Sequence, residues 1–233
     1  MISILQTSAE VDAVCQQLSS EGLFLHQTPQ KNWDHAKLME LLQEVPKAAR
    51  ILDLGSGGGP TLLLMHQLGY RDLAGMDFVV PQRKLRDRVR HALQPEAFHA
   101  SYAITQGDIC KTGLPDAQYD LITCVSVLEH DVDVDSFMKE AARLLKDGGQ
   151  LFATVDYWED FDQSKEEVKA VCGLPWNLFN RERLAALVTS ARAYGLEPIG
   201  TEEIPACGDR PVSYAGRDYT FAAVVLRKHG TGS

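Results

Sequence analysis

A glycine-rich segment that follows a short apolar run constrains this chain more than any other feature. Residues 51–60 read ILDLGSGGGP. The run Ile51–Leu54 is branched and apolar, which is typical of a strand buried on both faces of a parallel sheet. Four of the next five residues are glycine, so the backbone can turn tightly and a ligand can approach it. Pro60 then suits the first position of a helix over Thr61–Leu68. Strand, glycine turn and helix together predict the nucleotide-binding corner of a doubly wound α/β domain.

Carboxylates follow three successive apolar runs. Asp53 lies in the first run, and Asp77 follows Leu73–Met76, 22 residues after the first glycine of the turn. That interval is close to the roughly 20 residues expected before an acid that binds ribose. Asp108 follows a third run, Ala103–Gln106. Because open α/β sheets bind ligands at the carboxyl ends of their strands, we expect the three side chains to lie at one edge.

The turn does not fit a dinucleotide. A dinucleotide fingerprint needs G-x-G-x-x-G, and Pro60 stands where the third glycine would follow Gly55 and Gly57. A ligand with two phosphates should also find basic groups nearby, and the turn contains none. The carboxylates instead suit hydroxyls, amines and positive charge, all of which S-adenosylmethionine carries.

The chain resembles the class I (Rossmann-like) S-adenosylmethionine-dependent methyltransferases from about Ala49 to Lys228. ILDLGSGGG is similar to the family's first motif, GMDF to its ribose-binding motif and GDI to its adenine-side motif. YDLITCVSVLEH resembles the fourth strand and the turn after it, and later segments resemble the remaining elements in order. The resemblance implies a mostly parallel seven-stranded sheet with an antiparallel last strand, and S-adenosylmethionine as cofactor.

The same resemblance implies a set of cofactor contacts. Three of them have other readings from the sequence: Asp53 could instead tie down the glycine turn or do both, Asp77 could simply end a strand, and Asp108 could cap a turn. In the family reading, the methionine portion is held by Asp53, Gly55, Ser56 and Gly57, the ribose by Asp77, the adenine by Phe78, Asp108 and Ile109, and Ser126 lies near the methyl group.

The implied reaction is in-line displacement of a methyl group from a sulfonium by an oxygen or nitrogen of a small molecule. Alignment and exclusion of water would supply most of the catalysis. Where a base is needed, His130 of the Glu129–His130 pair is the first candidate, with Asp156 or Tyr157 in reserve. His130 could equally be structural. Transfer of an aminopropyl or carboxymethyl group, or a protein of this fold without turnover, are the alternatives.

Charge and composition exclude some partners. The net charge of −9 disfavours nucleic acid, and the D/N-P-P-aromatic motif of nucleic-acid amino methylases is missing after the fourth strand. One basic cluster, Arg83 to His91, lies on an expected helix from Gln82 to Leu93. This helix is either simply solvated or a dock for an acidic or phosphorylated ligand.

Neither a metal nor a membrane is expected. The acidic run Asp131, Asp133 and Asp135 lacks the glycine and glutamate of a calcium loop and instead suits a helix start. The chain has no run of eighteen apolar residues. Five widely spaced cysteines without a C-x-x-C pattern indicate free thiols in a reducing cytoplasm. A homodimer is a further expectation.

The chain divides into a helical cap (1–48), a core (49–228) and a tail (229–233). The cap is expected to contain one helix from Thr7 to Leu18 and a second over Trp33–Val45. His26 and Trp33 could then cover the cofactor as part of a lid. Within the core, an insertion of about residues 157–179 after the fifth strand should shape the substrate pocket.

Overall fold

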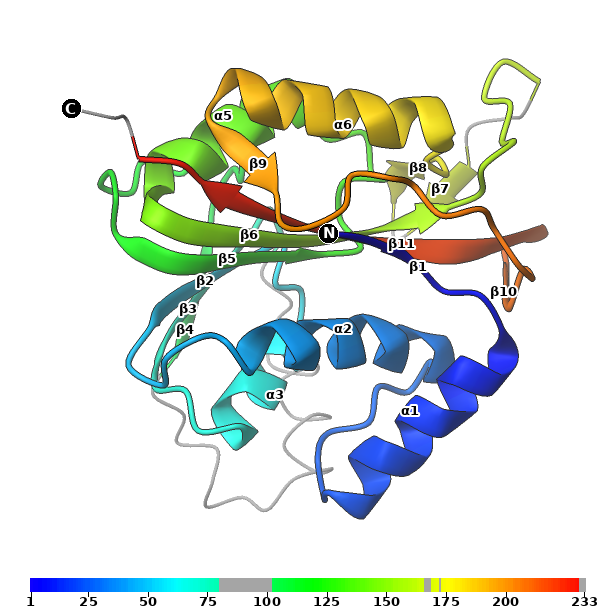
Figure 1. Cartoon of the computed structure of the whole chain (residues 1–233), viewed down its shortest axis with the longest axis horizontal. Coiled ribbons are helices and arrows are strands. Elements are labelled where there is room, and N and C mark those ends of the chain that lie inside the picture. Colours follow the sequence, from blue (N-terminus) through cyan, green and yellow to red (C-terminus); the bar gives the residue numbers. More distant parts are fainter. Residues whose placement is uncertain (80–101, 166–168, 172, 231–233) are drawn as a thin grey trace.

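A single twisted sheet lies between two layers of helices. The structure is a computed structural model that describes residues 1–79, 102–165, 169–171 and 173–230. In Figure 1, helices α5 and α6 cover one face of the sheet, and α1, α2 and α3 cover the other. Covering both faces is the arrangement that a buried, mostly parallel sheet requires.

The strand order is β1-β11-β6-β5-β2-β3-β4. Strands β2, β3, β4, β5 and β6 pair in parallel, and β11 runs antiparallel to β6. The predicted mostly parallel α/β sheet with an antiparallel last strand is therefore confirmed. The bounds are β1 Ile2–Ile4, β2 Arg50–Leu54, β3 Asp72–Asp77, β4 Ala103–Gln106, β5 Tyr119–Val125, β6 Leu145–Tyr157 and β11 Arg217–Lys228.

The sheet has more strands at its far edge than the predicted seven. Among the described residues it counts nine, because β1, β9 (Leu196–Pro198) and β10 (Val212–Tyr214) all pair antiparallel with β11. The N-terminal strand β1 was not predicted. Its two isoleucines are nevertheless buried, and Thr220 beside it donates to the backbone oxygen of Leu5.

The helices begin where the sequence offers caps. Thr7 accepts a hydrogen bond from the backbone N–H of Glu10, and Asp133 accepts from Asp135 and Ser136. Asp133 therefore opens a helix, as expected, and Pro60 lies in the first turn of α3. The helices are α1 Ser8–Ser20, α2 Asn32–Leu42, α3 Pro60–Gln67, α5 Val134–Leu144 and α6 Arg181–Ala193, with a short 3-10 helix, η1, at Pro29–Lys31.

The insertion after β6 contains a hairpin. Strands β7 (Lys169–Val171) and β8 (Leu174–Trp176) pair antiparallel, and no described residue between 158 and 179 is helical. The hairpin brings Trp176 back against the sheet, where its ring is fully buried.

The alternation of side chains along β6 directs two neighbouring candidate bases, Asp156 and Tyr157, to opposite faces of the sheet. Val155 and Tyr157 belong to the apolar core under α5 and α6, whereas Phe152 belongs to the core under α1, α2 and α3. Successive side chains of a strand point to opposite faces. Asp156 therefore faces the N-terminal helices, and Tyr157 faces away from them.

Candidate active site

The glycine turn is held by close packing on one side and is open on the other. Gly55 has φ of 78°, and a Cβ there would lie 2.3 Å from Cγ2 of Val127. Gly57 has φ of 49°, but a Cβ there would meet no described atom within 4 Å. The first glycine thus lets the turn pack against the loop after β5. The second leaves room for a ligand beside the backbone.

Asp53 lies beneath the turn rather than in the open space. It is 2% exposed, and its Oδ1 accepts a hydrogen bond of 2.6 Å from the hydroxyl of Thr123. The side chain of Ser56 donates to the Asp53 backbone oxygen at 2.6 Å. Burial raises the pKa of the Asp53 carboxyl to about 7. The residue therefore joins β2, β5 and the turn, and the carboxylate itself is bonded to a neighbouring strand.

The Asp53 pKa gives a pH prediction. Its folded carboxyl holds a proton up to about pH 7, whereas the unfolded group releases it near pH 4. The folded state thus binds more protons, so this contribution favours folding below about pH 4 and is lost as the pH rises toward 7. Between pH 4 and pH 7 this contribution to the free energy of unfolding falls by up to about 4 kcal/mol, and Asp53→Asn should remove that fall.

Urea unfolding of the ligand-free protein between pH 4 and pH 8 measures the effect. Asp12→Asn, on the exposed side of α1, is the matched control and should run parallel to the wild type. The prediction is wrong if Asp53→Asn also runs parallel to it.

Asp77 lies at the tip of β3, directly beside the turn. Its Oδ2 accepts from the backbone N–H of Gly57 at 2.7 Å, and its Oδ1 accepts from Val79 at 2.9 Å. Next to it, Phe78 is 66% exposed. A carboxylate and an exposed ring at the end of this strand agree with the implied ribose and adenine positions, and their contact with a cofactor stays a prediction.

Asp108 and Ile109 follow β4, the neighbouring strand. The backbone N–H of Gly107 donates to the Asp77 backbone oxygen at 2.9 Å, which places the two segments side by side. Oδ1 of Asp108 accepts from the Cys110 N–H at 2.8 Å, so the side chain caps a turn, as the alternative reading had it. Ile109 is buried in the core. The basic helix expected between Gln82 and Leu93 lies outside the described residues.

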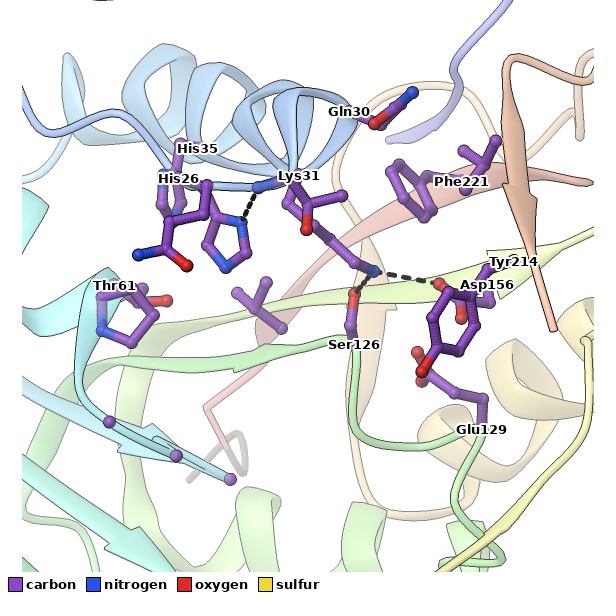
Figure 2. Close-up of a pocket in the computed structure, with 18 of the residues that line it drawn as sticks. His26, Gln30, Lys31, His35, Thr61, Ser126, Glu129, Asp156, Tyr214 and Phe221 are labelled. Carbon is purple, nitrogen blue, oxygen red and sulfur yellow. Dashed lines mark hydrogen bonds and ion pairs between the residues drawn. The ribbon is translucent and has the colours of Figure 1, made fainter. Parts of the chain in front are cut away.

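A cavity of about 590 Å³ opens over the turn. Figure 2 shows His26 near Thr61 on one side and Tyr214, Asp156 and Glu129 on the other. The predicted residues that line it are Gly55, Ser56, Gly57, Ser126, His130 and Asp156, and those that do not are Asp53, Asp77, Phe78, Asp108, Ile109 and Tyr157.

Lys31 occupies the middle of this cavity. Its Nζ donates to Oγ of Ser126 at 2.5 Å and to Oδ1 of Asp156 at 3.0 Å, and it lies 3.9 Å from Asp34 (Figure 2). The indole N–H of Trp176 donates to the other Asp156 oxygen at 2.8 Å. The sequence did not reveal this ion pair, because Lys31 and Asp156 are far apart in the chain. Asp156 is therefore held by two donors, which weakens it as a base.

Burial changes the protonation of this cluster. Burial, with Asp156 as a further cause, raises the pKa of Glu129 well above its usual value, and burial raises that of Asp34 to about 7. Burial opposes the charge of Lys31, but the carboxylates of Asp156, Asp34 and Glu129 outweigh it and raise the Lys31 pKa. The ammonium is therefore charged.

Of the candidate bases, His130 lines the cavity and Tyr157 does not. Nδ1 of His130 lies 3.2 Å from the backbone oxygen of Pro175, which can only accept, so Nδ1 carries the proton and Nε2 has the free lone pair. Tyr157 is fully buried on the other face of β6, its hydroxyl has no partner among the described residues, and burial raises its pKa. The expectation that Tyr157 is a reserve base is therefore corrected by the side-chain alternation along β6.

Of the two residues expected to cover the cofactor, only His26 lines the cavity. His26 lines the cavity, and its Nδ1 accepts from the Thr28 N–H at 3.0 Å. Trp33 is buried in the core, and its indole N–H donates to Glu10. Trp33 therefore stabilises the packing of α1 on α2 and does not cover the cavity. Whether the segment closes as a lid stays a prediction.

Comparison with known proteins decides the family. Residues 35–199 match the family model described as a methyltransferase domain. The chain belongs to this methyltransferase family. A ubiquinone biosynthesis O-methyltransferase from Bordetella avium (strain 197N) is 30% identical over 176 residues, which cover 70% of this chain and 69% of that protein.

Solved structures agree with the fold of this methyltransferase. The [4+2]-cyclase SpnF has a TM-score of 0.65 at 18% identity, covering 94% of this chain and 93% of that one. A Burkholderia thailandensis 1,6-didemethyltoxoflavin-N1-methyltransferase with bound S-adenosylhomocysteine has a TM-score of 0.58 at 16% identity, covering 98% and 93%. The family model and the Bordetella avium relative make the chain an S-adenosylmethionine-dependent methyltransferase, and the solved structures add its fold.

The methyltransferase's own residues fit that cofactor. The turn is open at Gly57, and the Asp77 carboxylate lies directly beside it, where its Oδ2 accepts from the Gly57 N–H. Among the described residues, no group of acidic, cysteine or histidine side chains could hold a metal ion. In the same part of the chain, no helix is long and apolar enough to span a membrane.

Proposed function

We propose that the enzyme methylates a hydroxyl oxygen of a small molecule, with His130 as general base. The observation that carries the proposal is the shared cavity: its wall runs from the glycine turn to His130, whose Nε2 lone pair is free of its Pro175 contact. Its volume of about 590 Å³ is in the range of small-molecule sites. The name of the Bordetella avium relative, an O-methyltransferase, supports oxygen as the acceptor atom.

Asp77 and the backbone of Gly55, Ser56 and Gly57 would hold the cofactor. When bound, S-adenosylmethionine supplies a methyl group made electrophilic by the positive sulfur. The Asp77 oxygens now accept backbone N–H groups, and a carboxylate has further lone pairs that can accept the ribose hydroxyls. Ser126, between the turn and the acceptor end, lines the same wall.

The chain's remaining task is to position the acceptor and take one proton. Correct alignment alone can supply roughly 7–11 kcal/mol of the barrier. His130 Nε2 would accept the hydroxyl proton as the oxygen attacks, a role typically worth 10²–10⁴-fold in rate. The ion pair of Lys31 with Asp156 is already formed, so neither group needs to take up this proton.

The proposal also includes the compartment, the division of the chain and the oligomeric state. A reducing cytoplasm is supported by the four described cysteines, which are all free. The division into a cap (1–48), a core (49–228) and a tail is supported by the position of β2 at the start of the parallel sheet. A homodimer stays a prediction without a described interface.

Product mass tests the function. We expect purified enzyme with S-adenosylmethionine to add one methylene unit to at least one member of a panel of phenols, catechols and hydroxylated amines, and to release S-adenosylhomocysteine. The panel holds each compound also as its methyl ether, which should stay unchanged. Addition of an aminopropyl or carboxymethyl group, or methylation of the ethers at nitrogen, would contradict the proposal.

A further inference from the structure

Aromatic rings surround the acceptor end of the cavity. The Trp176 ring lies edge-on to Tyr214 at 6.0 Å and to Tyr219 at 5.5 Å, and Tyr219 lies 5.9 Å from Phe221. All four rings line the cavity. Lys31 already places its Nζ 4.0 Å from the centre of the Phe221 ring. Such ring faces attract positive charge, and several rings around one cation form a known type of ammonium site.

Carboxylates lie beside these rings without enough donors. Glu129 is 1% exposed and lines the cavity, and neither of its oxygens has a hydrogen-bond partner in another described residue. Oδ1 of Asp34 also has none. Figure 2 shows Glu129 and Asp156 at the same end of the cavity. A buried acceptor left unpaired costs about 1–3 kcal/mol, and more when it is charged.

Carboxyl groups and cations gather around this end of the cavity, but only one of the cations enters it. Asp34, Asp156 and Glu129 surround the single ammonium of Lys31, which already pairs with Asp156. The Arg183 guanidinium lies over the Phe179 ring and interacts electrostatically with Glu129, but it does not line the cavity. The Arg217 guanidinium lies 5.1 Å from the centre of the Trp176 ring and does not line the cavity either. Three carboxyl groups therefore face three cations, of which only Lys31 enters the cavity. Burial raises the pKa of Glu129 and of Asp34, and a bound ammonium would favour the ionised form of both.

We propose that the acceptor carries a positively charged amino group, which binds between the unpartnered Glu129 carboxylate and the rings of Trp176, Tyr214 and Tyr219. This deepens the proposed function, on which it rests, by defining the acceptor as a hydroxylated amine. An ammonium N–H would supply the donors that the Glu129 oxygens lack. A neutral phenol would offer them no charged donor, and an anion would lie against Glu129 and Asp156.

A matched set of three probes tests the charge. Tyramine, 4-ethylphenol and 3-(4-hydroxyphenyl)propionate share a phenol ring and a two-carbon chain and differ in ending with an ammonium, nothing or a carboxylate. Calorimetry with the enzyme saturated by S-adenosylhomocysteine should show tyramine binding at least tenfold more tightly than the other two. Binding of S-adenosylhomocysteine itself is recorded first, so that loss of the cofactor site, which would overturn the proposed function, is seen separately.

Variants test which residues cause the preference for the ammonium probe. Glu129→Gln keeps the shape and removes the charge, and it should reduce the preference for tyramine over 4-ethylphenol at least fivefold. Asp156→Asn should reduce it as well. Glu40→Gln, on the exposed side of α2, should leave the preference unchanged. The proposal is overturned if tyramine binds no more tightly than 4-ethylphenol, including the case in which no probe binds, or if Glu129→Gln keeps the full preference.

Discussion

Replacing His130 by alanine should reduce kcat by two to four orders of magnitude, the usual contribution of a general base. The reason is geometric: the backbone oxygen of Pro175 accepts a hydrogen bond from the Nδ1–H group of His130. Nε2 is therefore the free acceptor at the cavity wall. The side chain is partly exposed and its loss opens no large hole in the core, so folding should be retained. Affinity for S-adenosylmethionine, measured by calorimetry, should change little because the turn lies elsewhere in the wall.

His26 provides the matched control for that variant. Its Nδ1 accepts from the Thr28 N–H, so its Nε2 carries the proton and cannot act as a base. His26→Ala should therefore affect KM more than kcat. If His26→Ala lowers kcat as much as His130→Ala does, the assignment of the base is wrong.

Replacing Gly55 by alanine should destabilise the fold by about 2–5 kcal/mol, from left-handed strain and from overpacking together. The new Cβ would lie 2.3 Å from Cγ2 of Val127 at a φ of 78°. Urea unfolding monitored by circular dichroism measures the loss. Removing the obstruction with Val127→Ala in the same chain should restore part of it, because the nearest atoms all belong to the Val127 side chain.

Gly57→Ala should distinguish the effect of packing on stability from the effect of open space on cofactor binding. Its φ of 49° carries the same kind of strain, but no described atom lies within 4 Å of the added Cβ. Stability should fall by only about 1–2 kcal/mol, while affinity for S-adenosylmethionine should fall clearly because the methyl group occupies the open side of the turn. Equal destabilisation by the two variants would contradict this account of the turn.

Local sequence patterns predicted the parts of the fold that depend on local physics. The apolar run before the turn, the proline in the first turn of α3 and the Asp133 cap each express a preference of a few neighbouring residues. Because parallel strands end at one edge, the same patterns also placed Asp77 beside the glycine turn. The family resemblance added the cofactor.

Tertiary contacts explain what the sequence did not predict. The ion pair between Lys31 and Asp156 joins the N-terminal segment to β6, and nothing near either residue indicates the other. Strand β1 is too short to show a pattern and depends on its pairing with β11. Tyr157 is different: the alternation of side chains along a strand could have shown that it faces away from Asp156.

Calorimetric titration of S-adenosylmethionine into the wild type and into Asp77→Ala tests the central claim most directly. The claim is that the glycine turn and the strand-tip carboxylate beside it form the cofactor site. Binding by the wild type at one site per chain, with affinity lost at least tenfold in Asp77→Ala while its urea unfolding stays close to wild type, is the predicted result. Unchanged affinity in a folded Asp77→Ala, or no binding by the wild type, would contradict it.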